Sequence, residues 1–144
     1  MPPGRTVKVL DAASAAYIAG LVDGEGTITL SRLHAKENRR LVVSISNNDS
    51  QLLAFVLGCV GAGKITRKRT YQPQHAPAFA FQLSGRQALA LLLCIAPYLR
   101  SYKAKRAQLA LESYLAVTPR NGKYTPELLT ARLAFERRFF AMRP

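Results

Sequence analysis

Glu25, a single acidic residue, stands between two glycines at the end of a segment rich in small residues. Ala16, Gly20 and Gly24 lie four residues apart, so in a helix they form one stripe of small side chains. Such a stripe lets two helix backbones approach closely. If the second helix belongs to another copy of the chain, two Glu25 carboxylates meet, and a divalent cation would neutralise them. The alternative is close packing of this helix within its own chain.

The charge of the chain indicates a polyanionic partner. Its 144 residues include 21 Lys and Arg but only 8 Asp and Glu, giving a formal net charge of +13, while 49% of the residues are hydrophobic. That hydrophobic content excludes a disordered basic chain and favours one domain over residues 1–144, with residues 1–10 as a flexible N-terminal arm. Nucleic acid is the first candidate partner and an anionic membrane surface the second.

Neither membrane insertion nor disulfide bonding is predicted. The longest apolar run, residues 88–99, is shorter than the roughly 20 residues of a spanning helix and contains Pro97. Cys59 and Cys94 form no CxxC pair and no disulfide framework. We therefore expect buried thiols in an intracellular, reducing compartment, either the cytoplasm and nucleoid or an organelle matrix.

Hydrophobic patterning predicts the elements that must position Glu25. Apolar periodicity and capping residues predict helices over residues 13–22, 50–59, 88–95, 103–116 and 126–140. Alternating apolar and polar residues predict strands over 27–31, 41–46, 64–71 and 79–83. The order αββαββα predicts an α+β fold with a four-stranded antiparallel sheet, helices on one face and additional C-terminal helices.

The sheet face without helices is the expected partner surface. Residues 27–83 carry eight Lys and Arg against two acids, Glu37 and Asp49, a net +6. A polar, basic, four-stranded face suits nucleic acid. A merely solvated face is the alternative, although such faces usually mix both signs of charge.

Residues 18–26, IAGLVDGEG, resemble the signature of the LAGLIDADG homing endonucleases. The length, the element order and the basic sheet are similar to those of single-motif members, and the resemblance covers roughly residues 13–116. It implies a sequence-specific endonuclease that makes a metal-dependent double-strand break in a long pseudo-palindromic DNA site as a homodimer. The alternative is a non-catalytic nucleic-acid binder of the same fold, either an intron RNA maturase or a DNA-binding regulator; RNA is a partner only in that case.

The resemblance also implies the metal site and its lysine. Glu25 matches the acid that binds the essential metal, and Gly24 matches the residue whose backbone carbonyl adds a ligand. Mg²⁺ is the expected cofactor of such an all-oxygen site, with Mn²⁺ or Ca²⁺ as substitutes in binding. Lys103 matches the active-site lysine, which would stabilise charge on the scissile phosphate. A solvated basic helix start is the alternative for Lys103.

Other residues of the resemblance take supporting roles. Asn47 matches a polar position that often orders active-site water. Gln51 matches a second peripheral catalytic position, although it is neutral where a positive charge can occur. Asp23 matches an acid that is structural rather than catalytic. Ala16, Gly20 and Gly24 would form the dimer interface.

Strand parity predicts which side chains face DNA. Ile28 and Leu30 are expected in the core, so the residues between and beyond them face the partner. Lys68 and Arg40 are the best candidates for guanine contacts in the major groove and Gln82 for an adenine contact, with phosphate contact as the alternative. The full expected DNA-binding set is Thr29, Ser31, Leu33, Arg40, Val42, Ser44, Ser46, Lys64, Thr66, Lys68, Thr70 and Gln82.

Overall fold

The chain follows the predicted order of helices and strands, in a computed structural model that describes residues 6–68 and 77–144. The strands are β1 (Gly26–Ser31), β2 (Arg40–Asn47), β3 (Lys64–Lys68) and β4 (Ala78–Ser84). The helices are α1 (Ala12–Glu25), α2 (Ser50–Val60), α3 (Gly85–Ile95), α4 (Lys103–Ser113) and α5 (Pro126–Ala141). Two short 3-10 turns, η1 (Ala96–Tyr98) and η2 (Leu115–Val117), follow α3 and α4. The predicted α+β order αββαββα with C-terminal helices is confirmed.

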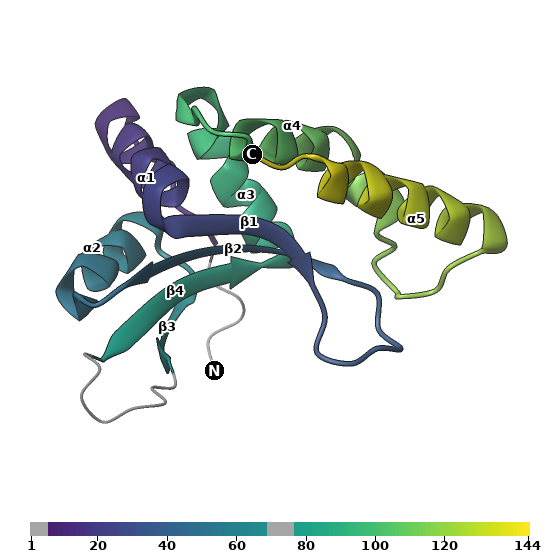
Figure 1. Ribbon diagram of the computed structural model, residues 1–144, viewed down its shortest axis with the longest axis horizontal. Helices are drawn as coiled ribbons and strands as arrows, with labels where there is room; N and C mark the ends of the chain where they lie inside the picture. Colours follow the sequence, from purple (N-terminus) through teal and green to yellow (C-terminus); the bar gives the residue numbers. More distant parts are fainter. Residues whose placement is uncertain (1–5, 69–76) are drawn as a thin grey trace.

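All four strands belong to one antiparallel sheet with the order β1-β2-β4-β3. Figure 1 shows the helices gathered on one side of this sheet, with α1 and α2 near one end and α5 extending past the other. The register aligns one row of side chains across the opposite, helix-free face. That row consists of Thr27, Ser44, Gln82 and Lys64.

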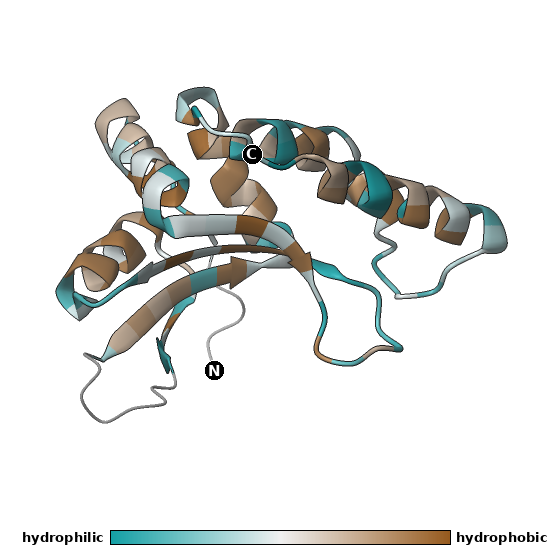
Figure 2. Ribbon diagram, viewed as in Figure 1, coloured by the Kyte–Doolittle hydropathy of each residue, from teal (hydrophilic) through white to brown (hydrophobic). Residues whose placement is uncertain are grey.

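The core lies between the sheet and the helices. Ile28, Leu30, Leu41, Val43 and Ile45 point into it and are at most 4% exposed, so the predicted strand parity is confirmed. Each such aliphatic side chain contributes about 1.5–3 kcal/mol when fully buried. In Figure 2, the β1–β2 loop is mainly hydrophilic, in contrast to the apolar strand and helix positions that build the core.

Helix α1 is longer than predicted and runs into the sheet without a loop. Asp11 caps its start by accepting a hydrogen bond from the Ser14 N–H. Its last residue is Glu25, and β1 begins at Gly26. A Cβ on Gly26 would lie 2.6 Å from the Ser44 carbonyl oxygen, so only glycine permits this junction. The acid of the motif is therefore carried by the last helical turn.

Residues 6–10, which belong to the expected N-terminal arm, lie against the rest of the domain. The Lys8 N–H donates to the Val60 carbonyl oxygen at 2.8 Å, and Val7 and Leu10 pack against the core. These residues are fixed beside the end of α2. Within the described parts of the chain, no helix is both long and apolar enough to span a membrane. Cys59 and Cys94 are free and only partly buried, where full burial was expected.

Candidate active site and nucleic-acid interface

Glu25 is held by Asn47, which lies where β2 ends. Asn47 Nδ2 donates to Glu25 Oε2 at 2.5 Å. The other end of the same amide is fixed, because Asn47 Oδ1 accepts the Asp49 N–H at 2.8 Å. Asp49 in turn caps α2 through the N–H groups of Gln51 and Leu52. Asn47 thus orients a Glu25 side chain that remains exposed.

Lys103 lies beneath the end of α1 and is only 8% exposed. Its Nζ donates to the carbonyl oxygens of Val22 and Asp23, both at 2.9 Å. The Val22 carbonyl also accepts the Gly26 N–H that ends α1, and the Asp23 carbonyl lies in the same last turn, where C=O groups take partners from outside the helix. Burial lowers the pKa of Lys103, while the Asp23 charge opposes that shift. Lys103 therefore stabilises the helix end that carries Glu25; its predicted action on a phosphate stays a prediction.

Asp23 makes the reciprocal contact, from α1 to the turn just before α4. Its carboxylate accepts the Arg100 N–H at 2.8 Å, the Ser101 N–H at 3.1 Å and the Ser101 hydroxyl at 2.6 Å. Desolvation is the largest single influence and acts to raise the pKa of Asp23. The Ser101 and Arg100 hydrogen bonds and the Lys103 charge outweigh it and lower that pKa. These contacts fit the structural role expected for Asp23.

Gln51 lies in the first turn of α2 with an exposed side chain. Its N–H group donates to Asp49 at 3.0 Å, which places it in the same short segment as Asn47. The catalytic role predicted for the Gln51 side chain stays a prediction.

The chain offers a partial set of ligands for a divalent metal. The Glu25 carboxylate and the Gly24 carbonyl both lie in the last turn of α1, where carbonyls point away from the helix without intrahelical donors. Both are oxygen donors, which suits Mg²⁺ or Ca²⁺. Over residues 6–68 and 77–144, no three His, Cys, Asp or Glu side chains gather into a metal site. These residues fit such a metal only if a second chain, water or phosphate completes the coordination.

The small-residue stripe of α1 is open to solvent. Ala16, Gly20 and Gly24 are all exposed. A Cβ added at Gly20 or Gly24 would meet nothing within 4 Å. Packing of this stripe within its own chain, the alternative considered above, is therefore excluded for the described residues.

The expected DNA-binding side chains that are described lie on the helix-free face or in the adjoining β1–β2 loop, exposed or partly exposed. Thr70 lies outside the described residues. DNA contact by this set remains a prediction. Thr27 and Ser84 share the face and were missed, although strand parity marks both; Thr27 Oγ1 and Ser44 Oγ are 2.7 Å apart.

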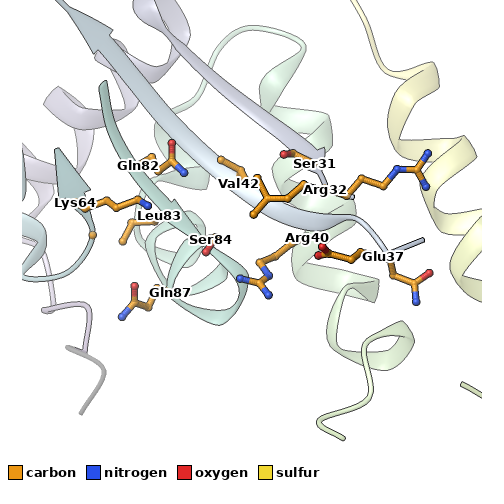
Figure 3. Close-up of a pocket in the computed structure, with 13 residues that line it drawn as sticks. Ser31, Arg32, Glu37, Arg40, Val42, Lys64, Gln82, Leu83, Ser84 and Gln87 are labelled. Carbon is orange, nitrogen blue, oxygen red and sulfur yellow. The ribbon is translucent and has the colours of Figure 1, made fainter. Parts of the chain in front are cut away.

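A groove of about 590 Å³ runs over this face. Figure 3 shows that Arg40, Gln82 and Lys64 enter it from β2, β4 and β3. Arg32 in the loop and Gln87 on α3 also line it and were not predicted. A strand pattern marks neither, because one lies beyond β1 and the other on a helix. The predicted residues that line the groove are Ser31, Leu33, Arg40, Val42, Lys64 and Gln82.

Arg39 and Arg67, two of the eight basic residues counted over residues 27–83, point away from the helix-free face. Arg39 Nη1 donates to Glu136 Oε1 at 2.8 Å, so its charge is paired with α5. Arg67 pairs in register with Phe79, on the opposite side of β3 from Lys64, Thr66 and Lys68. The charge available on the helix-free face is therefore smaller than the net +6 of residues 27–83.

No family model and no curated protein matches the sequence. The fold is nevertheless similar to solved structures. The homing endonuclease I-CvuI in complex with its target is 20% identical with a TM-score of 0.72, over 91% of this chain and 82% of that chain. Meganuclease I-SmaMI, bound to uncleaveable DNA, is 17% identical with a TM-score of 0.66, over 85% of this chain and 42% of that chain.

A third structure, the I-LtrWI LAGLIDADG homing endonuclease bound to target DNA, is 17% identical with a TM-score of 0.64. The match covers 85% of this chain and 42% of that chain. The IAGLVDGEG segment, with Glu25 as the last residue of α1, agrees with the predicted resemblance. The chain therefore has the fold of the LAGLIDADG homing endonucleases.

Proposed function

We propose that this chain is a sequence-specific, Mg²⁺-dependent DNA endonuclease that acts as a homodimer on a long pseudo-palindromic site. One observation carries the proposal. Glu25 is exposed at the foot of an open small-residue helix, is oriented by Asn47, and is joined directly to the first strand of a basic sheet.

Charge and shape of the helix-free face support DNA as the partner. Its described strand positions include Arg40, Lys64 and Lys68 and no acidic side chain. Cations distributed along a groove suit a phosphate backbone, and amide and guanidinium groups suit base edges. Homing endonucleases of the same fold have been solved with DNA.

The open stripe of α1 supports a homodimer. Gly20 and Gly24 leave space that no part of the described chain fills. Small residues at this spacing allow a second copy of the helix to approach at backbone distance. A chain of this length matches only 42% of I-SmaMI, so a second copy would supply a comparable amount of structure.

The proposed chemistry is hydrolysis of one phosphodiester in each DNA strand. Glu25 and the Gly24 carbonyl would hold the divalent ion, and the second copy, phosphate oxygens and water would complete the site. When bound, the ion supplies neutralisation of the charge that develops on the scissile phosphate. Asn47 keeps the Glu25 carboxylate in one orientation, and Lys103 with Asp23 keeps the last turn of α1 in place.

Cleavage of a randomised DNA library with Mg²⁺ tests the proposal. We expect symmetric products with the wild type, loss of cleavage with Glu25→Gln, and retained DNA binding by that variant. Glu127→Gln is the matched control, because Glu127 is exposed on α5 and the charge change is the same. Unchanged cleavage by Glu25→Gln would contradict the assignment.

Binding measurements on the same protein distinguish the proposed endonuclease from the alternative, a non-catalytic nucleic-acid binder. Selective DNA binding without cleavage by the wild type, in Mg²⁺ and in Mn²⁺, would assign the chain as a DNA-binding regulator. Preferential binding of structured RNA would assign it as a maturase. An intracellular, reducing location is part of the main proposal and is supported by the free Cys59 and Cys94.

A further inference from the structure

Two charged residues of α5 are buried against the end of the β1–β2 loop. Arg132 is 1% exposed and Glu136 is 6% exposed. Glu136 Oε2 accepts from Arg132 Nε at 3.1 Å, and Glu136 Oε1 accepts from Arg39 Nη1 at 2.8 Å. Arg132 Nη2 donates to the backbone carbonyl of Arg39. Both the main chain and the side chain of Arg39 are therefore fixed to α5.

Tyr114, which lies against Arg132, fixes Leu41, the residue on the other side of Arg40. The Leu41 N–H donates to the Tyr114 hydroxyl at 3.3 Å, and the Arg132 guanidinium lies 5.2 Å from the centre of the Tyr114 ring. Arg40 is thus held at both neighbours, Arg39 and Leu41. Its own side chain remains exposed and lines the groove of the helix-free face.

A contribution to folding stability alone does not explain why Arg132 and Glu136 are buried here. Buried ion pairs lose their hydration, and apolar residues of similar volume often stabilise a helix contact as well or better. Helix α5 already packs through the buried rings of Phe135 and Phe139. The Arg132–Glu136 pair also fixes the orientation of the groups that it binds, because each charge-assisted hydrogen bond constrains both distance and angle.

The β1–β2 loop has few contacts of its own that would hold it in one conformation. Residues 32–38 are all exposed, and within the loop the Glu37 N–H donates to the His34 carbonyl at 3.0 Å. The whole connection runs over residues 32–39, and its exposed part has many accessible conformations. Its path is restricted where it joins the strands and where Arg39 is held by α5.

We propose that Arg132 and Glu136 are positioning residues for DNA-sequence recognition. They fix the backbone at Arg39. They thereby set the direction in which the Arg40 side chain points toward the major groove of DNA, and they do not contact DNA themselves. This inference rests on the proposed function only in requiring that the helix-free face binds DNA.

The test compares binding selection from randomised DNA for four proteins: wild type, Arg40→Ala, Glu136→Gln and the control Glu127→Gln. Arg40→Ala identifies the base pairs that Arg40 reads. We expect Glu136→Gln to lose about fivefold or more discrimination at those base pairs, the amount that one bidentate contact supplies. The control should keep wild-type preferences. Combining Arg40→Ala with Glu136→Gln should add no further loss, because the second residue acts through the first.

Tyr114→Phe serves as a second variant in case Glu136→Gln does not fold, as judged by circular dichroism. It removes one hydroxyl and keeps the ring that lies against Arg132, and we expect the same local loss of discrimination. A folded variant with wild-type preferences, or a loss spread evenly over the site, would overturn the inference alone. A wild type that selects no sequence would overturn the proposed function, and the inference with it.

Discussion

Lys103 and Asp23 join the end of α1 to the beginning of α4 by hydrogen bonds that run both ways, an arrangement called the α1–α4 clasp below. The Lys103 ammonium donates to the Asp23 carbonyl at 2.9 Å, while the Asp23 carboxylate accepts the Ser101 hydroxyl and N–H, two residues before Lys103. Ser101 Oγ also accepts the Lys103 N–H at 3.2 Å. Because Glu25 follows Asp23 by two residues, this clasp determines where the candidate metal-binding acid lies.

Replacing Lys103 with Met should lower the free energy of unfolding by about 1–3 kcal/mol, because the Val22 and Asp23 carbonyls lose a charged donor. Urea denaturation measures the change. Lys105→Met is the matched control, since Lys105 is exposed on the same helix and should change stability little. Equal stabilities of the two variants would show that the clasp contributes nothing.

Asp23 should make stability depend on acid pH. Its folded pKa is lowered, so its contribution is fully present above the ordinary Asp pKa of about 3.9 and is lost as pH falls through the lower folded value. Asp23→Asn should be less stable than the wild type by about 1–3 kcal/mol at neutral pH. The gap should close as pH falls below about 4. A gap that stays constant over this range would refute the role given to the Asp23 charge.

Asn47→Asp should place a like charge beside Glu25, and two carboxylates this close repel each other unless one of them takes up a proton. This repulsion is absent at low pH, where the carboxyl groups are protonated, so the stability of the variant should be greatest there and fall as pH rises. Thermal unfolding between about pH 4 and 7, without divalent cations, measures this loss against the wild type. Asn47→Ala is the control, because it removes the contact without adding charge. A stability of Asn47→Asp that does not fall across this range would argue that the Asn47–Glu25 contact is not maintained.

Gly20→Leu should abolish the proposed dimerisation through α1 while leaving the monomer folded. A side chain at this position meets nothing within 4 Å in the chain itself, whereas it would separate two closely packed helices. Sedimentation equilibrium reports the mass, and circular dichroism reports the fold. Ala134→Leu, on the exposed side of α5, should leave the dimer intact. A dimer that persists in Gly20→Leu would place the interface elsewhere.

Local patterns were sufficient for the order of elements and for the faces of the strands. Asp11, Asp49 and Thr125 cap their helices through side-chain bonds, and the sequence places Asp11 and Asp49 directly before helical runs as candidate caps. The end of α1 was placed too early, at residue 22 and not Glu25, because Asp23 and the two glycines suggest a turn. There, contacts with Lys103 and Ser101 outweigh local propensity.

The contacts that define the site could not be predicted in this way. Glu25 meets Asn47 across 22 positions of the chain, and Arg39 meets Glu136 across 97. Such pairs depend on strand register and helix docking, which residue spacing does not encode. Arg39 was accordingly counted as a surface charge, although it is paired with α5.

The direct junction of α1 and β1 has a geometric consequence. No loop separates Glu25 from Gly26, and β1 rises about 3.4 Å per residue, so its six residues span about 17 Å to Ser31 at the rim of the groove. DNA advances about 3.4 Å per base pair, which makes this length equivalent to about five base pairs. For DNA that lies along β1, the proposed enzyme would therefore keep a constant offset of this length between the broken bond and the bases recognised at the far end of the strand.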